Sequence, residues 1–140
     1  LHVTGDPLQL HQLLRNLLGN AIKYTPNGGE IQLAAKMDGS QIFINVQDNG
    51  FGIPTTDLPF IFDRFYRVRD GKASEVEGNG LGLAIVKSII ESHNGTISVE
   101  SEVGKGTCFS VALPFLINAE TTLPKPDICN SNKKESIHGQ

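Results

Sequence analysis

The chain has 140 residues, of which 39% are hydrophobic and 19% are charged, and its formal net charge is −3. This length can bury a hydrophobic core within one domain. The slightly acidic balance argues against a nucleic-acid-binding surface, which needs a basic stripe. No stretch approaches the length of a membrane span and no signal peptide opens the chain. We therefore expect a cytoplasmic domain without membrane contact of its own, whether or not its parent protein is membrane-anchored.

The two cysteines, Cys108 and Cys129, are too few for a disulfide framework. Cys108 lies in a strand-like run and is expected to be a small core residue. A reducing compartment is the default expectation. The abrupt opening at Leu1 suggests the middle of a longer protein.

The first part of the chain predicts a helix followed by a β-hairpin. Apolar spacing predicts the helix over 7–24, with Asp6 as its N-cap and a proline in its first turn. A Thr-Pro-Asn-Gly-Gly run over 25–29 ends it. Apolar and polar residues then alternate over 31–35 and 42–46 around an Asp-Gly turn, which indicates two paired strands.

The remainder predicts a short helical piece, a mobile loop, a second long helix and two strands. These elements cover residues 57–65, 66–80, 81–93, 96–101 and 107–114, respectively. The loop is charged and lacks an apolar period, whereas the helix is apolar over most of its girth. The helix ends at Asn94-Gly95, which suits a C-terminal cap.

These elements make one domain over residues 1–114, followed by a polar, aperiodic tail over 115–140 that we expect to be disordered. Antiparallel strands with helices packed on one face give the α+β class. The predicted architecture is a two-layer α/β sandwich.

One face of the first predicted helix carries polar groups suited to a nucleotide. Asn16, Asn20, Lys23 and Tyr24 stand at i, i+4, i+7 and i+8, within one arc at roughly 100° per residue. Amides are uncommon on a plain solvated face, because Glu and Lys hold a helix better. Amide oxygens suit Mg²⁺, the lysine charge suits phosphate, and the tyrosine ring suits a base. Taken alone, the two asparagines fit an ordinary polar face better.

A carboxylate followed by glycines opens the loop after the second predicted strand. Gly50 and Gly52 would let the backbone come close to a ligand. Asp48 can accept a hydrogen bond from an exocyclic amine such as that of adenine. Taken alone, this loop fits an ordinary Asp-Asn-Gly turn better.

A second glycine-rich stretch opens the second long helix. Gly78, Gly80 and Gly82 precede Leu83, and exposed N–H groups at a helix start attract phosphate. The G-x-G-x-G spacing and the absence of a preceding strand exclude the dinucleotide fingerprint. A bare glycine-rich turn fits about as well as a phosphate site.

An aromatic and basic segment lies between the two glycine-rich stretches. Phe62 and Phe65 are expected to anchor the loop on the core. An arginine beside a phosphate site can reach a terminal phosphoryl group. Arg67 is the candidate for that role, whereas Arg64 is expected to be solvated.

In their order and spacing, these segments resemble the catalytic ATP-binding domain of two-component sensor histidine kinases, in the superfamily that includes gyrase, chaperone and mismatch-repair ATPases. The resemblance runs from about residue 6 to residue 114. Residues 16–24, 48–54, 61–67, 78–86 and 104–109 resemble the family's N box, first glycine box, F box, second glycine box and last hairpin, respectively. The resemblance implies a Bergerat-type sandwich: a mixed, mostly antiparallel sheet of about five strands, with about three helices on one face.

The resemblance also implies ATP and Mg²⁺ as cofactors. The implied nucleotide-binding residues are Asn16, Asn20, Lys23, Tyr24, Asp48, Gly50, Gly52, Arg67, Gly78, Gly80, Gly82 and Leu83. Asn20, with Asn16 beside it, would bind Mg²⁺. Asn16, Lys23 and Arg67 would form the catalytic set.

The remaining roles divide between the base and the γ-phosphate. By resemblance, Tyr24 would line the base and Asp48 would bond the adenine amine. Arg67 would approach the γ-phosphate, and residues 66–80 would form a lid over it.

One position favours phosphoryl transfer over hydrolysis. By resemblance, hydrolysing members of the superfamily carry a Glu-x-x-x-Asn pattern here, and its Glu, the general base for water, stands where this chain has Asn16. An amide cannot act as a general base at neutral pH. The family's phosphoacceptor histidine lies on a separate dimerisation hairpin, in a His-Glu-x-x-x-Pro-like setting. The histidines of this chain, none in that setting, are His2, His11, His93 and His138.

The partners implied by the resemblance are the dimerisation and histidine-phosphotransfer hairpin of the same parent protein and the receiver domain of a response regulator. Two other functions fit the same boxes. One is a serine/threonine kinase of the anti-sigma type. The other is a nucleotide-binding signalling module that carries out no transfer.

Overall fold

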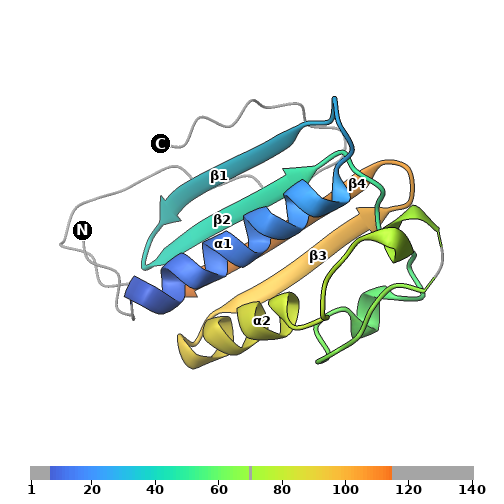
Figure 1. Ribbon diagram of the computed structural model, residues 1–140. Helices are drawn as coiled ribbons and strands as arrows, with labels where there is room; N and C mark the ends of the chain where they lie inside the picture. The colour runs from blue at the N-terminus through green and yellow to red at the C-terminus, as the bar shows by residue number, and fades with distance from the viewer. Residues whose placement is uncertain (1–6, 70, 115–140) are drawn as a thin grey trace.

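The computed structural model of the chain describes residues 7–69 and 71–114. In this part of the chain two α-helices, two 3₁₀ turns and four strands follow one another (Figure 1). Their bounds in chain order are α1 (Pro7–Tyr24), β1 (Ile31–Asp38), β2 (Gln41–Asp48), η1 (Leu58–Phe60), η2 (Lys72–Glu75), α2 (Gly82–Ser92), β3 (Thr96–Glu102) and β4 (Gly106–Pro114). The predicted order of long helices and strands is confirmed.

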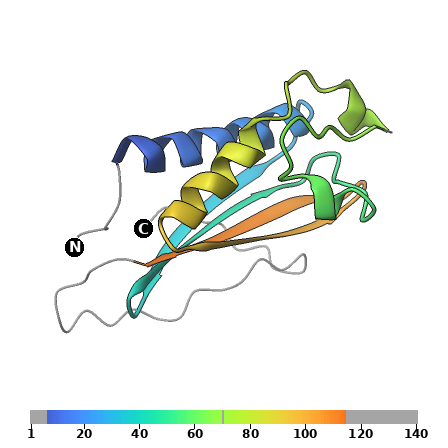
Figure 2. The same cartoon turned by 90° about the horizontal axis from the view of Figure 1, so that it is seen from below.

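The four described strands form one sheet in the order β1-β2-β4-β3, and each described pairing is antiparallel. Both α-helices lie across one face of this sheet (Figure 1), and the turned view shows the two layers (Figure 2). The predicted α+β sandwich is therefore confirmed. Over the described residues it has four strands instead of about five and two long helices instead of about three.

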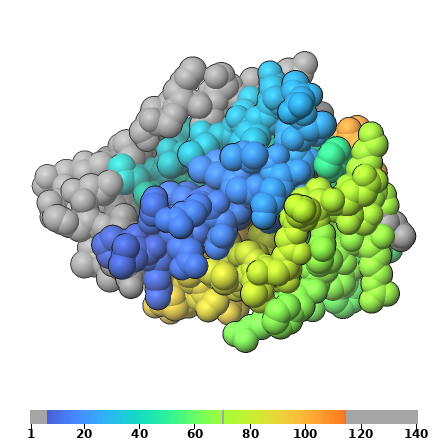
Figure 3. Space-filling model, viewed as in Figure 1, coloured from blue at the N-terminus to red at the C-terminus, as the bar shows by residue number. Residues whose placement is uncertain are grey.

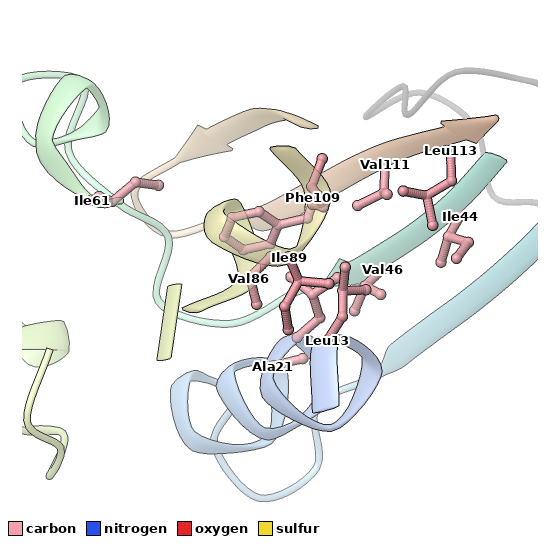
Figure 4. Packing of buried hydrophobic residues seen from close by; sticks show 12 residues of the cluster. Leu13, Ala21, Ile44, Val46, Ile61, Val86, Ile89, Phe109, Val111 and Leu113 are labelled. Carbon is pink, nitrogen blue, oxygen red and sulfur yellow. The ribbon is translucent and has the colours of Figure 1, made fainter. Parts of the chain in front are cut away.

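The core lies between the helices and the sheet. Helical spacing brings three residues of α1 inward, namely Leu13, Leu17 and Ala21. Alternate residues of β2 and β4 face the helices, namely Ile44, Val46, Phe109, Val111 and Leu113. Figure 4 shows side chains of both layers meeting in this space, with Val86 and Ile89 of α2 among them.

The C-terminal end of α2 forms as predicted. Asn94 adopts a left-handed backbone with φ 59°, and the Gly95 N–H donates to the Ile90 carbonyl at 2.8 Å. This 6→1 bond closes the last turn of the helix. The His93 ring adds a contact of 2.8 Å from Nδ1 to the Ile89 carbonyl, so this histidine caps its helix. Asp6, the predicted cap of α1, lies outside the described residues.

The aromatic segment between β2 and α2 differs from the prediction. The expected helical piece over 57–65 is a single 3₁₀ turn, η1. Phe62 does anchor the segment, because its ring meets the ring of Phe109 edge-on at 6.3 Å. Phe65 does not: its backbone is left-handed, with φ 66°, and 70% of the residue is exposed. A left-handed residue cannot continue a right-handed helix, so no helix runs through Phe65.

The connection from 66 to 80 is mostly irregular, as predicted, but it contains the 3₁₀ turn η2. An Arg67 guanidinium N–H donates to the Val76 carbonyl across this connection. At the α2 end, the Phe65 N–H donates to the Gly80 carbonyl at 2.9 Å. The mobility of this connection stays a prediction.

Three further expectations concern the cysteines, the tail and the membrane. Cys108 is buried, as expected of a core residue, and it is disulfide-bonded. Cys129 and the tail over 115–140 lie outside the described residues. Among the described helices, none has the length and apolar character needed to cross a membrane.

Candidate functional site

The polar face of α1 lines a cavity of about 450 Å³ beside the connection that leads into α2. All four residues predicted on that face contribute to it: Asn16, Asn20, Lys23 and Tyr24. In Figure 3 the yellow-green segment before α2 lies against the second half of α1. The predicted arc of amides, cation and ring therefore faces a hollow.

Asn16 has an unsatisfied group in this cavity. Its Nδ2 atom is buried and has no hydrogen-bond partner among the described residues. A buried donor without a partner costs about 1–3 kcal/mol. Since the oxygen and nitrogen of an amide are assigned from their partners, the side chain can present either atom to a ligand. Asn16 is thus available to a phosphate oxygen or, turned over, to a cation.

The start of α2 lines the opposite side of the same cavity. Gly78, Gly80, Gly82 and Leu83 all contribute to its wall, as predicted. The Asn79 side chain accepts a hydrogen bond of 3.1 Å from the Leu81 N–H. The N–H groups of the first helical turn have no partner within the helix and carry its positive dipole end. This wall is suited to an anion.

Asp48, the last residue of β2, lies at a second, smaller cavity of about 60 Å³. Only 7% of Asp48 is exposed. Its Oδ1 atom accepts hydrogen bonds from the N–H groups of Gly50 at 2.8 Å and Thr107 at 3.3 Å. Since both donors reach the same oxygen, Oδ2 is left for a ligand.

The two cavities adjoin each other. Four of the predicted residues line both of them: Asn20, Tyr24, Arg67 and Leu83. The small cavity is otherwise largely apolar, with Ile53, Ile61 and Phe109 in its wall. The site therefore has an apolar end closed by a carboxylate and a larger end lined by amides, a lysine and a helix start.

Arg67 and Tyr66 lie across the junction of the two cavities. Both line each cavity, and the Tyr66 hydroxyl donates to Asp57 Oδ1. Burial raises the pKa of Tyr24, and the positive charge of Arg67 opposes this rise. The guanidinium is therefore close enough to the end of α1 to influence its tyrosine.

Gly50 and Gly52 lie against backbone of other parts of the chain. A Cβ on Gly50 would lie 2.0 Å from the Tyr24 carbonyl oxygen, and one on Gly52 would lie 2.1 Å from the Glu102 carbonyl oxygen. These glycines therefore let the loop approach protein backbone, at the end of α1 and at the β3–β4 turn. Gly52 lines the small cavity, whereas Gly50 lines neither of the two cavities.

The sequence reasoning missed several residues that line the site. Arg15, Glu77 and Asn79 line the larger cavity, and Thr107 lines the smaller one. The alternation of β4 already indicates that Thr107 shares a face with Phe109. Its position opposite Asp48 depends on strand register, which the sequence alone does not define.

The donor set of the site limits how a metal could be held. The described residues contain no group of three or more His, Cys, Asp or Glu side chains placed to hold a metal ion. A cation in the larger cavity would therefore take amide oxygens from the protein, and the unpaired amide of Asn16 fits this requirement.

The buried position of Asp48 has a consequence for stability. Burial raises the pKa of its carboxyl group above the ordinary 3.8, and the hydrogen bonds from Gly50 and Thr107 partly oppose the rise. The folded chain therefore holds this proton at pH values where the unfolded chain has lost it. Because the folded state binds more protons, this group stabilises the fold fully only below pH 3.8, and its contribution is lost as pH rises through the folded pKa.

We expect Asp48→Asn to remove this dependence. Relative to the variant, the free energy of unfolding of the wild-type chain should fall as pH rises from about 4 and level off above the folded pKa. At neutral pH, without ligand, the variant should be the more stable protein. Urea unfolding of both proteins across this range measures the difference. A difference that stays constant with pH would contradict the prediction.

Comparisons with known proteins agree with this fold. The family model described as histidine kinase-, DNA gyrase B-, and HSP90-like ATPase matches residues 5–117. The sensor histidine kinase CusS of Escherichia coli O6:H1 is 46% identical over 112 residues, which are 80% of this chain and 23% of CusS. The mycobacterial sensor histidine kinase MprB superimposes with a TM-score of 0.73 at 31% identity, over 81% of this chain and 76% of that one. Full-length ShkA in complex with AMPPNP superimposes with a TM-score of 0.68 at 34% identity, over 80% of this chain and 22% of ShkA.

The family model covers most of this chain, and the proteins compared above are sensor histidine kinases. The chain belongs to the family of histidine kinase-, DNA gyrase B- and HSP90-like ATPases. Within the family it is a catalytic ATP-binding domain of the sensor histidine kinase type. It spans 23% of the length of CusS.

Proposed function

We propose that this chain binds Mg²⁺–ATP and transfers the γ-phosphoryl group to a histidine on a separate dimerisation hairpin of its parent protein. The receiver domain of a response regulator would then take the phosphoryl group. The observation that carries this proposal is the pairing of two adjoining cavities with different chemistry. One is small, largely apolar and closed by Asp48, and the other is larger and lined by amides, Lys23 and the start of α2.

Each end suits a different part of the nucleotide. Oδ2 of Asp48 would accept a hydrogen bond from the adenine amine, with Tyr24 against the base. Lys23 and the N–H groups at Gly82 and Leu83 would hold the phosphates in the larger cavity. Since Asn20 lines both cavities, it would lie beside the link between base and phosphates.

Asn20 and Asn16 would hold Mg²⁺ through their side-chain oxygens. When bound, Mg²⁺ supplies positive charge at the phosphate oxygens. The buried unpaired amide of Asn16 supports this role, because a bound cation or phosphate would give that side chain a partner. Arg67 would release the Val76 carbonyl and turn its guanidinium to the γ-phosphate.

The segment over 66–80 would act as a lid. The small cavity measures about 60 Å³, far below the roughly 300–1,000 Å³ of an ordinary ligand pocket. Because Tyr66, Arg67 and Val68 form part of its wall, outward movement of this stretch would open the space for a base. Phosphate contacts would then order the segment again.

Transfer is favoured over hydrolysis because α1 offers no general base to a water molecule. Asn16 occupies the position at which the resemblance places a general-base Glu in hydrolysing members of the superfamily. Among the described residues of the larger cavity, Glu77 is the only carboxylate, and it is an exposed residue of the segment before α2.

The purified chain with Mg²⁺–ATP should form no phosphoprotein and hydrolyse ATP only slowly. Mixed with the histidine-bearing hairpin of its parent protein, it should produce an acid-labile phosphohistidine on the hairpin. Phosphorylation followed with radiolabelled ATP measures this, and chelation of divalent ions should abolish it.

A pair of α1 variants provides the control. Asn20→Ala should slow transfer strongly, whereas Gln12→Ala, an exposed position on the same helix, should leave it unchanged. Rapid hydrolysis by the chain alone, or equal transfer by the two variants, would overturn the proposal.

A further inference from the structure

Three polar side chains form a row across the sheet at the nucleotide end. Asp48 of β2 pairs in register with Thr107 of β4, and Thr107 pairs with Ser101 of β3. Register partners point to the same face of a sheet. The next residues on the same face, two positions away along each strand, are the apolar Val46, Phe109 and Val99. The row therefore ends the hydrophobic core under the helices.

Ser101 has three hydrogen-bond partners in this row. Its Oγ lies 2.7 Å from the Ile53 nitrogen, 3.0 Å from the Gly106 carbonyl oxygen and 2.8 Å from the Thr107 Oγ1. A serine hydroxyl has one proton to donate and two lone pairs to accept with. The Ser101 hydroxyl can therefore satisfy all three partners in only one arrangement.

The partners define that arrangement. The Gly106 carbonyl can only accept, so it takes the Ser101 proton. The Ile53 N–H can only donate, so it occupies one lone pair of Ser101. The remaining lone pair must accept the proton of Thr107. Thr107 has then donated its only hydroxyl proton away from the small cavity that it lines.

We propose that Ser101 is a positioning residue for base selection, because it holds the Thr107 hydroxyl as an acceptor toward the base. This inference rests on the proposed binding of ATP at Asp48. The carboxylate of Asp48 and the oriented hydroxyl of Thr107 together present acceptors and no donor. They match a purine whose 6-substituent is an amino group, with two N–H bonds to donate. A purine with a 6-oxo group would instead place its oxygen, an acceptor, against the acceptor oxygens of Asp48 and Thr107.

The test compares ATP with inosine triphosphate, whose base carries a 6-oxo group in place of the amine. Calorimetry on the wild-type chain should show tighter binding of ATP. In Ser101→Ala, the Thr107 hydroxyl loses the acceptor for its proton and becomes free to donate to the 6-oxo group. The ratio of the two dissociation constants should then fall by about 5- to 10-fold, the worth of one hydrogen bond.

Two matched variants separate positioning from fold stability. Ser101→Thr keeps the hydroxyl and should retain the wild-type ratio. Ser98→Ala makes the same change at an exposed position of β3 and should also retain it. A general loss of stability would weaken both nucleotides alike, so the ratio reports positioning.

An unchanged ratio in Ser101→Ala, or equal binding of both nucleotides by the wild-type chain, would overturn the inference while nucleotide binding stands. A wild-type chain that binds neither nucleotide would overturn the proposed function itself, and the inference with it.

Discussion

Truncation of Leu17 to alanine is expected to lower the free energy of unfolding by about 2–5 kcal/mol. Leu17 is 0% exposed and lies on the inner face of α1, between Leu13 and Ala21 in the central cluster. Removing its branched end leaves a cavity that the flanking helix and sheet can fill only in part. This loss is a large share of the roughly 5–15 kcal/mol that stabilises an ordinary domain.

Urea unfolding followed by circular dichroism measures this effect. Ile22→Ala provides the control on the same helix, because Ile22 is 65% exposed. That change should stay within about 0.5 kcal/mol of the wild-type chain. Equal losses in the two variants would show that α1 does not pack as described.

Replacement of Asp48 by alanine is expected to weaken ATP binding by about 5- to 150-fold. The variant would leave the adenine amine without its acceptor in a largely apolar cavity, at a cost of about 1–3 kcal/mol. The fold should survive, because burial already opposes the ionised form of this carboxyl group. Loss of binding should therefore not be loss of structure.

Titration calorimetry with ATP compares Asp48→Ala with Asp38→Ala. Asp38 ends β1 and lines neither of the two cavities, so its variant should bind ATP as the wild-type chain does. Equal affinity in the wild-type chain and Asp48→Ala would remove Asp48 from the proposed site.

The sequence predicted most of the fold because its signals are local. Apolar spacing marked α1, a mostly apolar run marked α2, and alternation marked β1 and β2. The cap at Asn94-Gly95 formed as expected because it depends on one turn of backbone. The aromatic segment was predicted less well, since composition does not reveal that Phe65 adopts a left-handed backbone and leaves the core.

In the candidate site, too, the residues that lie on one element were predicted, and those that meet through strand pairing were not. Helical spacing brought the polar residues of α1 to one cavity, as predicted, because all of them lie on one element. Ser101 and Thr107 could not be placed beside Asp48, because their meeting depends on the register of three strands. The close contacts of Gly50 and Gly52 with distant backbone are hidden from the sequence for the same reason.

The row formed by Asp48, Thr107 and Ser101 also bears on how the chain folds. The Thr107 bond to Asp48 spans 59 residues, and the Ile53 bond to Ser101 spans 48. Closing such long loops carries a higher entropic cost than forming the β1–β2 hairpin, whose strands adjoin in sequence. The base-binding end is thus completed only when the whole topology is in place, and partly folded chains that retain their hairpins would lack it.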